Sequence, residues 1–355
     1  MKIGILTLPL HTNYGGILQA YALYSTLKEM GHDVTLIDGK MYQVSTVREK
    51  TSVAVWQVMY HLGFRPTIHP QLIVQNEMES IIPFIETHIP QQISLDKVKS
   101  NTFEAIIVGS DQVWRGDYCS LFPFFLDFAE GWNIRRIAYA ISFGKDEWHQ
   151  NSNVLTKCRH LIKAFDFVSV REKSGINICR EQLQCDAEWV IDPTMLKTAE
   201  EYKKLLPKAS NPSKRYLVSY ILDKNTYSQG IVFETAKKRN LDIKEMKLPA
   251  NGEKAISVEE WLKTLLNAEF VITDSFHCTV FSLLFNRPFV VLENYERGNS
   301  RLISLLGVLG VSNRIAHNMT ESASIEEYPI VWRDVNHEMT KQREKFINVI
   351  YRLLS

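Results

Sequence analysis

The first 38 residues read as a strand, a helix and a second strand, and this order constrains the fold more than any other feature of the sequence. Residues 2–6 form a short apolar run. Residues 16–30 carry apolar side chains three and four positions apart, which predicts a helix that ends at Gly31. Residues 33–38 read as the next strand. A strand, a helix and a strand in succession form a right-handed unit, so we expect a parallel sheet.

The same alternation continues through most of the chain. A first series has strands at residues 105–109, 136–142, 167–170 and 188–191, with helices at 153–164 and 172–182. A second series has strands at 215–222, 241–246, 270–273 and 289–292, with helices at 227–239, 258–266, 276–285 and 299–306. Residues 41–100 are rich in aromatic side chains and are expected to be mainly helical.

The length of the chain indicates two domains, because one hydrophobic core seldom serves as many as 355 residues. Asp192-Pro193-Thr194 interrupts the strand pattern, and two further prolines follow soon after. We therefore expect one Rossmann-like domain at residues 1–195 and a second at 196–330. Residues 331–355 should form a helix that packs back on the first domain. The expected fold class is α/β, with two doubly wound domains facing across a cleft.

The composition excludes several classes of protein. Hydrophobic residues make up 45% of the chain and charged residues 23%, and the net charge of +1 gives no field to attract nucleic acid. No run approaches the roughly 20 apolar residues that an integral membrane segment needs. The amino-terminal run lacks a signal-peptide cleavage site. The five cysteines are scattered without a CxxC pair, so neither a disulfide framework nor a zinc site is indicated. A cytoplasmic protein is expected.

Polar clusters follow the predicted strands, and ligands of open parallel sheets bind beyond the carboxyl ends of strands. The first cluster is the turn of residues 12–16, TNYGG. Gly15 and Gly16 let the backbone approach a ligand closely, and the free N–H groups of the helix that follows favour an anion. Asn13 lies in the same turn. A tight turn without a ligand explains the spacing equally well.

Two more clusters end strands of the first series. Ser110, Asp111 and Gln112 leave the strand of residues 105–109 together, and Trp114 follows them. Such side chains suit recognition of hydroxyl groups, with the indole stacked on a sugar. The alternative is that Asp111 caps a helix or turn while Trp114 belongs to the core. Ser142 ends another strand, two residues before a glycine.

Arg171 stands between a strand and the next helix. A guanidinium in that place can bind a carboxylate or phosphate through two hydrogen bonds, aided by the free N–H groups of the helix. The alternative is a surface ion pair between Arg171 and Glu172.

The sharpest cluster is residues 273–277, TDSFH, after an apolar strand. His277 is the natural group for proton transfer, because the ordinary pKa of histidine lies near physiological pH. A hydrolase triad is the obvious rival, but Ser275 lacks a GxSxG elbow, and three such close neighbours cannot readily form a triad. Arg297 and Arg301 add positive charge downstream.

Together these segments resemble those of the polysaccharide pyruvyl transferase family over nearly the whole chain. Two residues depart from the family pattern: Arg115 follows Trp114 where Asn is frequent, and Cys278 follows His277 where Gly is common. The Cys278 side chain is expected to narrow the pocket. The matching segments, in order, are residues 12–16 with 19–23, 109–114, 140–144, 171–175, 192–194, 273–277 and 299–301.

The resemblance implies a GT-B-like architecture and a reaction. The pyruvyl group of phosphoenolpyruvate would form a ketal on a sugar, in a cell-surface polysaccharide or in its lipid-linked or nucleotide-linked precursor. Phosphoenolpyruvate is the donor substrate, and no cofactor and no metal are expected. A lipid-linked acceptor would bring the protein into peripheral contact with a membrane. The first domain is expected on the acceptor side.

This reaction needs an acid/base, cations for a carboxylate and a phosphate, and hydrogen bonds to sugar hydroxyls. We assign His277 as the acid/base, Arg171 as the anchor of the anion and Arg301 as a second cation. Asp111 is placed on the acceptor side, where it also accepts a hydroxyl proton. The remaining predicted binding residues are Asn13, Gly15, Gly16, Ser142 and Ser275.

Two other functions fit the same architecture. A glycosyltransferase that uses a nucleotide-sugar would need an acid for the ribose, and Glu293 or Glu296 could supply it. A non-catalytic sugar-binding relative is the second alternative. The presence of His277, Arg171 and Asp111 together argues against it.

Overall fold

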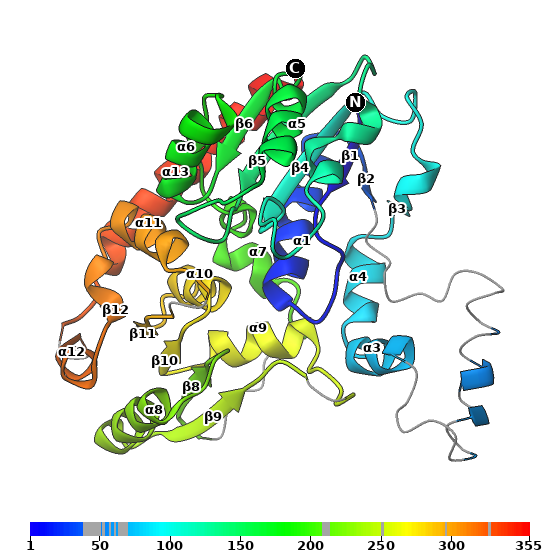
Figure 1. Ribbon diagram of the computed structural model, residues 1–355. Coiled ribbons are helices and arrows are strands. Elements are labelled where there is room, and N and C mark those ends of the chain that lie inside the picture. Colours follow the sequence, from blue (N-terminus) through cyan, green and yellow to red (C-terminus); the bar gives the residue numbers. More distant parts are fainter. Residues whose placement is uncertain are drawn as a thin grey trace.

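The computed structural model shows two α/β units stacked on one another (Figure 1). It describes residues 1–37, 70–207, 214–249, 252–294, 297–325 and 328–355, together with scattered positions between 51 and 62. Much of the expected helical stretch 41–100 therefore lies outside the described residues. Its described part contains two helices, α3 (Pro70–Met78) and α4 (Ile82–His88).

The first sheet has seven strands in the order β3-β2-β1-β4-β5-β6-β7. Every pair within it is parallel. All seven residues of the central strand β4 are buried, as expected for a strand with helices on both faces of its sheet. The strands are β1 (Lys2–Leu6), β2 (Asp33–Ile37), β3 (Gln92–Ile93), β4 (Ala105–Asp111), β5 (Arg135–Ile141), β6 (Phe167–Val170) and β7 (Glu188–Trp189).

The second sheet has five parallel strands in the order β12-β11-β10-β8-β9. Both sheets are doubly wound, so the fold is α/β with two Rossmann-like units, as in GT-B proteins. The strands are β8 (Tyr216–Tyr220), β9 (Asp242–Met246), β10 (Phe270–Thr273), β11 (Phe289–Leu292) and β12 (Ile315–Ala316).

The helices that the apolar periodicity predicts are present, with small shifts at their ends, whereas α7 and α12 were not predicted. The expected helix 172–182 is α6 followed by a turn of π-helix, Cys179–Leu183. The last helix, expected at residues 331–355, spans Trp332–Leu354. The remaining helices are α1 (Tyr14–Glu29), α5 (Ser152–Ile162), α6 (Lys173–Ile178), α7 (Ala199–Lys203), α8 (Thr226–Arg239), α9 (Val258–Leu266), α10 (Phe276–Leu284), α11 (Ser300–Val308), α12 (Met319–Ile325) and α13 (Trp332–Leu354).

A single hydrophobic core continues from one unit into the other. The Tyr14 ring of α1 stacks on Trp261 of α9, with centroids 5.4 Å apart, and its hydroxyl donates to the Ile256 carbonyl at 2.9 Å. Tyr202 of α7 meets Phe281 of α10 edge to face at 4.8 Å. Because these contacts are buried and aromatic, they hold the two sheets against each other.

Helix α13 returns from the second unit to the first, where it runs behind the sheet (Figure 1, red). Phe346 is fully buried, and its ring lies 6.3 Å from that of Trp189 after β6. Arg343 Nε donates to the Met195 carbonyl at 2.9 Å. The carboxyl-terminal helix therefore bridges both units.

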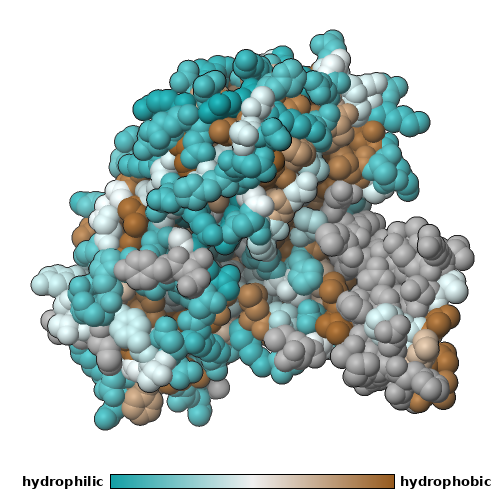
Figure 2. Space-filling view, in the orientation of Figure 1, coloured by the Kyte–Doolittle hydropathy of each residue, from teal (hydrophilic) through white to brown (hydrophobic). Residues whose placement is uncertain are grey.

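The surface is mainly hydrophilic over the helices of the first unit (Figure 2). An apolar area at the lower right of the same view lies over the segment that contains Val55, Val58, Met59 and Leu62, whose side chains are exposed. Among the described residues, no helix is both long and apolar enough to cross a membrane.

Replacing Phe346 by Ala should lower the free energy of unfolding by about 3–5 kcal/mol, because it leaves a cavity between α13 and the first sheet. Urea denaturation measures the change. Tyr351→Ala on the same helix is the control, since Tyr351 is exposed and its loss should shift stability by less than about 0.5 kcal/mol. Equal effects of the two changes would show that α13 is not anchored through Phe346.

Candidate functional site

The predicted site residues gather where the two sheets face each other. In the first sheet the strand order reverses between β1 and β4, and in the second between β8 and β10. Ligands of doubly wound sheets bind at these switch points, beyond the carboxyl ends of the strands. Residues 12–16 follow β1, residues 110–112 close β4, and residues 273–277 follow β10. The fold thus brings together three of the clusters that the sequence separates.

Arg171 lies at the centre of the site, and its side chain is only 1% exposed. Its Nη1 is 2.7 Å from Asp192 Oδ2 and its Nη2 is 3.1 Å from Asp111 Oδ1. Both carboxylates are also buried. Removing charges from water costs several kcal/mol per ion, which only close opposite charges and hydrogen bonds offset. The alternative of a surface pair between Arg171 and Glu172 is therefore wrong.

Asp192 connects Arg171, Thr194 and His277. The sequence predicts no role for it beyond its place in a motif. Its Oδ1 accepts from the Thr194 backbone N–H at 3.0 Å and from the Thr194 hydroxyl at 2.7 Å. Burial by itself raises the pKa of the Asp192 carboxyl, but the charges of His277 and Arg171 outweigh burial and hold this pKa well below its usual range. Asp192 is therefore an anion at neutral pH.

His277 reaches this network from the second unit. Its Nε2 lies 3.6 Å from Asp192 Oδ2 and has no hydrogen-bond partner, although the atom is buried. The other face of the ring lies against α1, where a Cβ added to Gly15 would come within 1.9 Å of His277 Nδ1. Only glycine at position 15 leaves room for the imidazole. In the pair of glycines of the first turn, Gly15 therefore provides the space that His277 of the second unit occupies.

Arg301, in the first turn of α11, places a second cation beside the first. It is 8% exposed, its Nη2 donates to the Arg297 carbonyl at 2.8 Å, and its Nε has no partner. Burial, together with the charge of Arg171, lowers the pKa of Arg301 to about 10, so the guanidinium stays charged at neutral pH. The Phe276 ring contacts both guanidinium groups, with centroid distances of 5.1 Å to Arg171 and 5.8 Å to Arg301.

Glu172 is a residue of the site that the sequence analysis did not assign. It is fully buried, and its Oε1 accepts from the backbone N–H of Phe143 at 2.6 Å and more weakly from that of Gly144 at 3.4 Å. Burial raises the pKa of its carboxyl, against the pull of Arg171 and Arg301. Ser142 is also fully buried, and its hydroxyl accepts from the Gly144 N–H at 3.0 Å. Ser142 thus supports this loop from beneath.

Asn13, Gly16 and Asp111 form the wall of the site on the first unit. Asn13 Nδ2 lies 3.4 Å from Asp111 Oδ2, and a Cβ at Gly16 would come within 3.3 Å of the same oxygen. Asp111 holds a left-handed backbone conformation, with φ of 75°, that is rare for a residue with a side chain. Ion pairing to Arg171 and the bond from Asn13 keep this carboxylate in place.

Asp274 and Ser275 shape the loop that carries His277. Asp274 accepts from the backbone N–H groups of Leu222 and Asp223 at 2.7 and 3.1 Å, so it ties the end of β8 to that of β10. Ser275 caps α10 by accepting from the Cys278 N–H at 3.5 Å. His277 Nε2 faces Asp192 instead of Ser275, so this site does not have the geometry of a hydrolase triad.

Two expectations about neighbouring side chains are wrong. Trp114 is fully buried, stacks on Phe125 at 4.6 Å and donates to the Phe124 carbonyl, so it belongs to the core and offers no face to a sugar. Cys278 is also fully buried and lies within the core, where burial raises the pKa of its thiol to about 12. It therefore does not narrow the pocket.

Several buried polar atoms at this site have no hydrogen-bond partner. They are Arg171 Nε, His277 Nε2, Glu172 Oε2 and Arg301 Nε. Helices α1 and α11 both begin here without a side-chain cap, so their first N–H groups add positive potential. The arginine nitrogens and the helix N–H groups are donors that suit an anionic ligand next to a proton-transfer group, whereas Glu172 Oε2 is an acceptor. Within the described ranges, no cluster of three or more metal-ligating side chains is found.

A family model and several solved structures are similar to this chain. The family model described as "Polysaccharide pyruvyl transferase" matches residues 13–295. No curated protein matches the chain. Among solved structures, UDP-N-acetylglucosamine 2-epimerase from Rickettsia bellii is similar at 12% identity and a TM-score of 0.51, over 99% of this chain and 96% of that one. The UDP-GlcNAc 2-epimerase of Methanocaldococcus jannaschii shares 14% identity, over 99% and 100%, with a TM-score of 0.48.

Replacing Gly15 by Ala should force the His277 ring out of its place and lower the free energy of unfolding by about 1–3 kcal/mol. Histidine NMR spectra and urea denaturation report the two effects. Gly307→Ala in α11 is the matched control, because an added Cβ there meets nothing closer than 3.7 Å. An unshifted His277 resonance in Gly15→Ala would contradict the described contact.

Replacing Asp192 by Asn should lower the free energy of unfolding at pH 7 by about 3–5 kcal/mol, because a buried guanidinium loses a charged partner. The folded protein depresses the pKa of Asp192, so its contribution is present above about pH 4 and is lost as the pH falls further. The gap between wild type and variant should narrow between pH 4 and pH 2.

Asp242→Asn serves as the control for this measurement. Asp242 forms an exposed ion pair with Lys214, so its loss should change stability by less than about 1 kcal/mol at either pH. A gap for Asp192→Asn that stays constant with pH would contradict a depressed pKa.

Proposed function

We propose a donor and a mechanism for this chain, which belongs to the polysaccharide pyruvyl transferase family. The pyruvyl group of phosphoenolpyruvate is transferred to two hydroxyl groups of a sugar, and phosphate is released. The observation that carries this proposal is that His277 Nε2 and Arg301 Nε are both buried without a hydrogen-bond partner, while the ring of Phe276, the neighbour of His277, contacts the Arg301 guanidinium.

The cations and helix starts suit the donor, which carries a carboxylate and a phosphate. Among the described residues Arg301 forms no ion pair with a carboxylate, whereas both Nη atoms of Arg171 are held by Asp192 and Asp111. Arg301 is therefore the main anchor for the donor in this proposal. Arg171 acts mainly through its field and by holding Asp192 beside His277. From the sequence, Arg171 is assigned as the anchor of the anion and Arg301 as a second cation. In this proposal the two roles are exchanged.

His277 then supplies the proton. As an imidazolium it protonates the methylene carbon of phosphoenolpyruvate, and the cationic character that develops at C2 is met by attack of a sugar hydroxyl. The hydroxyl proton passes to a base and from there to the departing phosphate, and a second hydroxyl closes the ketal as its proton returns to His277. Asp192 stabilises the imidazolium from 3.6 Å and keeps the ring oriented.

Asp111 is the base that we assign on the acceptor side. It lies on the first unit, where Asn13 and the N–H groups that begin α1 can hold hydroxyls of the sugar. Its ion pair with Arg171 and the hydrogen bond from Asn13 hold the carboxylate in place. Because His277 Nε2 is buried, the two units separate to admit substrates and close again for the reaction.

The rival reaction uses a nucleotide-sugar donor and needs an acid for the ribose. Glu293 is already paired with His317 Nδ1 at 2.6 Å and accepts from Asn299 at 3.0 Å, while Glu296 lies outside the described residues. The geometry of Glu293 thus favours phosphoenolpyruvate.

Calorimetry with phosphoenolpyruvate against a panel of nucleotide-sugars separates the two donors. Binding of nucleotide-sugars alone would overturn the proposal. Release of phosphate from phosphoenolpyruvate only when acceptor is present would exclude a non-catalytic sugar-binding protein.

The His277→Gln variant should lose about 10²–10⁴-fold in kcat, because glutamine keeps the size of the side chain but cannot donate a proton. Its KM for phosphoenolpyruvate should change little, since the donor is anchored by Arg301. Steady-state release of phosphate in the presence of acceptor measures both constants.

His337→Gln is the matched control, because His337 is exposed on α13 away from the site. It should keep the activity of the wild type. Near-normal transfer by a folded His277→Gln protein would remove His277 from the mechanism.

A further inference from the structure

A second hollow lies on the first unit, beside the donor site. Its volume is about 160 Å³, and it opens between the loops that follow β4 and β5. Its lining is polar around an aromatic floor that includes Trp148. The polar residues that concern the argument are Arg115, Asp117, Lys145, His149 and Gln150.

Arg115 forms the wall between this hollow and the proposed site. Its Nη1 donates at 2.9 Å to the side chain of Gln112, which follows Asp111 directly. Its Cδ would lie 2.9 Å from a Cβ at Gly144, and Gly298 of the second unit packs against the carbonyl of that same glycine. A molecule that is bound at Asp111 and extends along the first unit therefore meets the side chains of Gln112 and Arg115 before it reaches the hollow.

The charges that line the hollow are balanced by one another. Asp117 accepts from Arg115 Nε at 3.0 Å and from Lys145 Nζ at 2.7 Å, and His149 lies 2.8 Å from Glu147. Such pairs give no strong preference for an anion. They offer fixed donors and acceptors to hydroxyl groups, and the Gln150 amide adds both kinds. A cavity of about 150 Å³ holds one benzene ring, so the hollow has room for one six-membered ring.

We infer that this hollow is the subsite for a neutral hexose unit of the acceptor, the one attached to the sugar that reacts. The inference rests on the proposed pyruvyl transfer and names the acceptor as at least a disaccharide. It also gives Arg115, where the family often has Asn, a role in the choice of acceptor.

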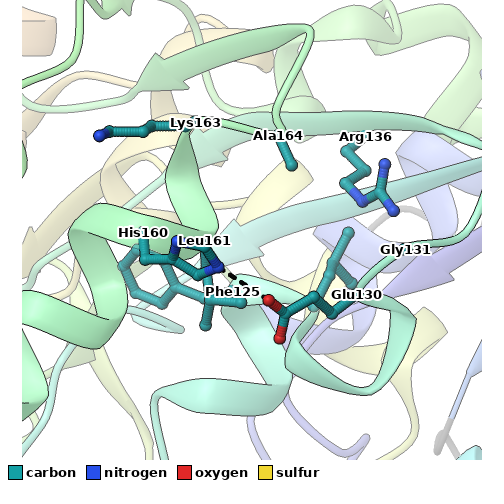
Figure 3. A pocket seen from close by; sticks show the side chains of 9 residues that line it. Phe125, Glu130, Gly131, Arg136, His160, Leu161, Lys163 and Ala164 are labelled. Carbon is teal, nitrogen blue, oxygen red and sulfur yellow. Dashed lines mark hydrogen bonds and ion pairs between the residues drawn. The ribbon is translucent and has the colours of Figure 1, made fainter.

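Another cavity, on the same unit, has a different character (Figure 3). It measures about 270 Å³ and lies at the amino end of β5, away from the site. Phe125 and Leu161 line it, and the Arg136 guanidinium there is already bound to backbone carbonyls. It contains His160 paired with Glu130 at 2.7 Å, the same kind of pair as His149 and Glu147. His160→Ala removes a polar side chain from this cavity and is therefore the control for a change in a hollow away from the site.

The test compares acceptors of one and two sugar units. Methyl hexopyranosides of the gluco, galacto and manno series, and disaccharides of the same hexoses, are titrated calorimetrically and assayed with phosphoenolpyruvate. Three variants are compared with the wild type. Gln150→Ala removes the amide, Gly116→Ala displaces it because the new Cβ would lie 2.4 Å from Gln150 Nε2, and His160→Ala is the control.

Wild type should bind a disaccharide about tenfold more tightly than its monosaccharide, and Gln150→Ala and Gly116→Ala should abolish most of this preference. The KM values for phosphoenolpyruvate and for monosaccharides should stay unchanged, and His160→Ala should behave like wild type. Equal loss of affinity for monosaccharide and disaccharide in these two variants would overturn the subsite. If phosphoenolpyruvate binds but no neutral sugar does, the inferred subsite is wrong while the proposed donor stands. If phosphoenolpyruvate does not bind, the proposed donor is wrong.

Discussion

The buried ion pairs of Arg171 with Asp192 and Asp111 are the constraint on which the site depends. Burying a charged guanidinium until it is 1% exposed costs free energy, which the close contacts to the two carboxylates offset. The three residues come from the ends of β4, β6 and the loop after β7, so their pairing fixes these strand ends together. Asp192 then remains free to face His277, which the second unit provides.

The contact between the two units is the second requirement. His277 can approach Asp192 only because Gly15 leaves room for its ring, and because Tyr14 and Trp261 hold α1 against α9. A substitution in any of these places changes the distance between the acid of one unit and the carboxylate of the other. The stacked rings of Tyr14 and Trp261 and the polar site are therefore parts of one interface between the two units, because Tyr14 and Gly15 are neighbours in the chain.

The sequence predicts the elements well where a long apolar run or a clear period exists, as for β10 and α9. It does not predict β3 and β12, since strands of two residues carry no pattern. It places Arg171 at a strand end, but its partners lie 21 and 60 positions away, and no local rule joins them. The sequence also does not show which side chains are buried. Trp114 and Cys278 have side chains that occur in binding sites, but both face the core. The paired glycines in the sequence indicate that something approaches the backbone closely at Gly15. The sequence does not indicate that this neighbour is the His277 imidazole of the other unit.

The central claim is that His277 faces the methylene carbon of phosphoenolpyruvate while Arg301 holds its anionic end. A crystal structure of the protein with phosphoenolpyruvate measures this most directly. The account predicts the methylene carbon within about 3.5 Å of His277 Nε2 and a carboxylate or phosphate oxygen on the Arg301 guanidinium. Phosphoenolpyruvate bound away from both residues, in a crystal with the cleft accessible, would contradict the account.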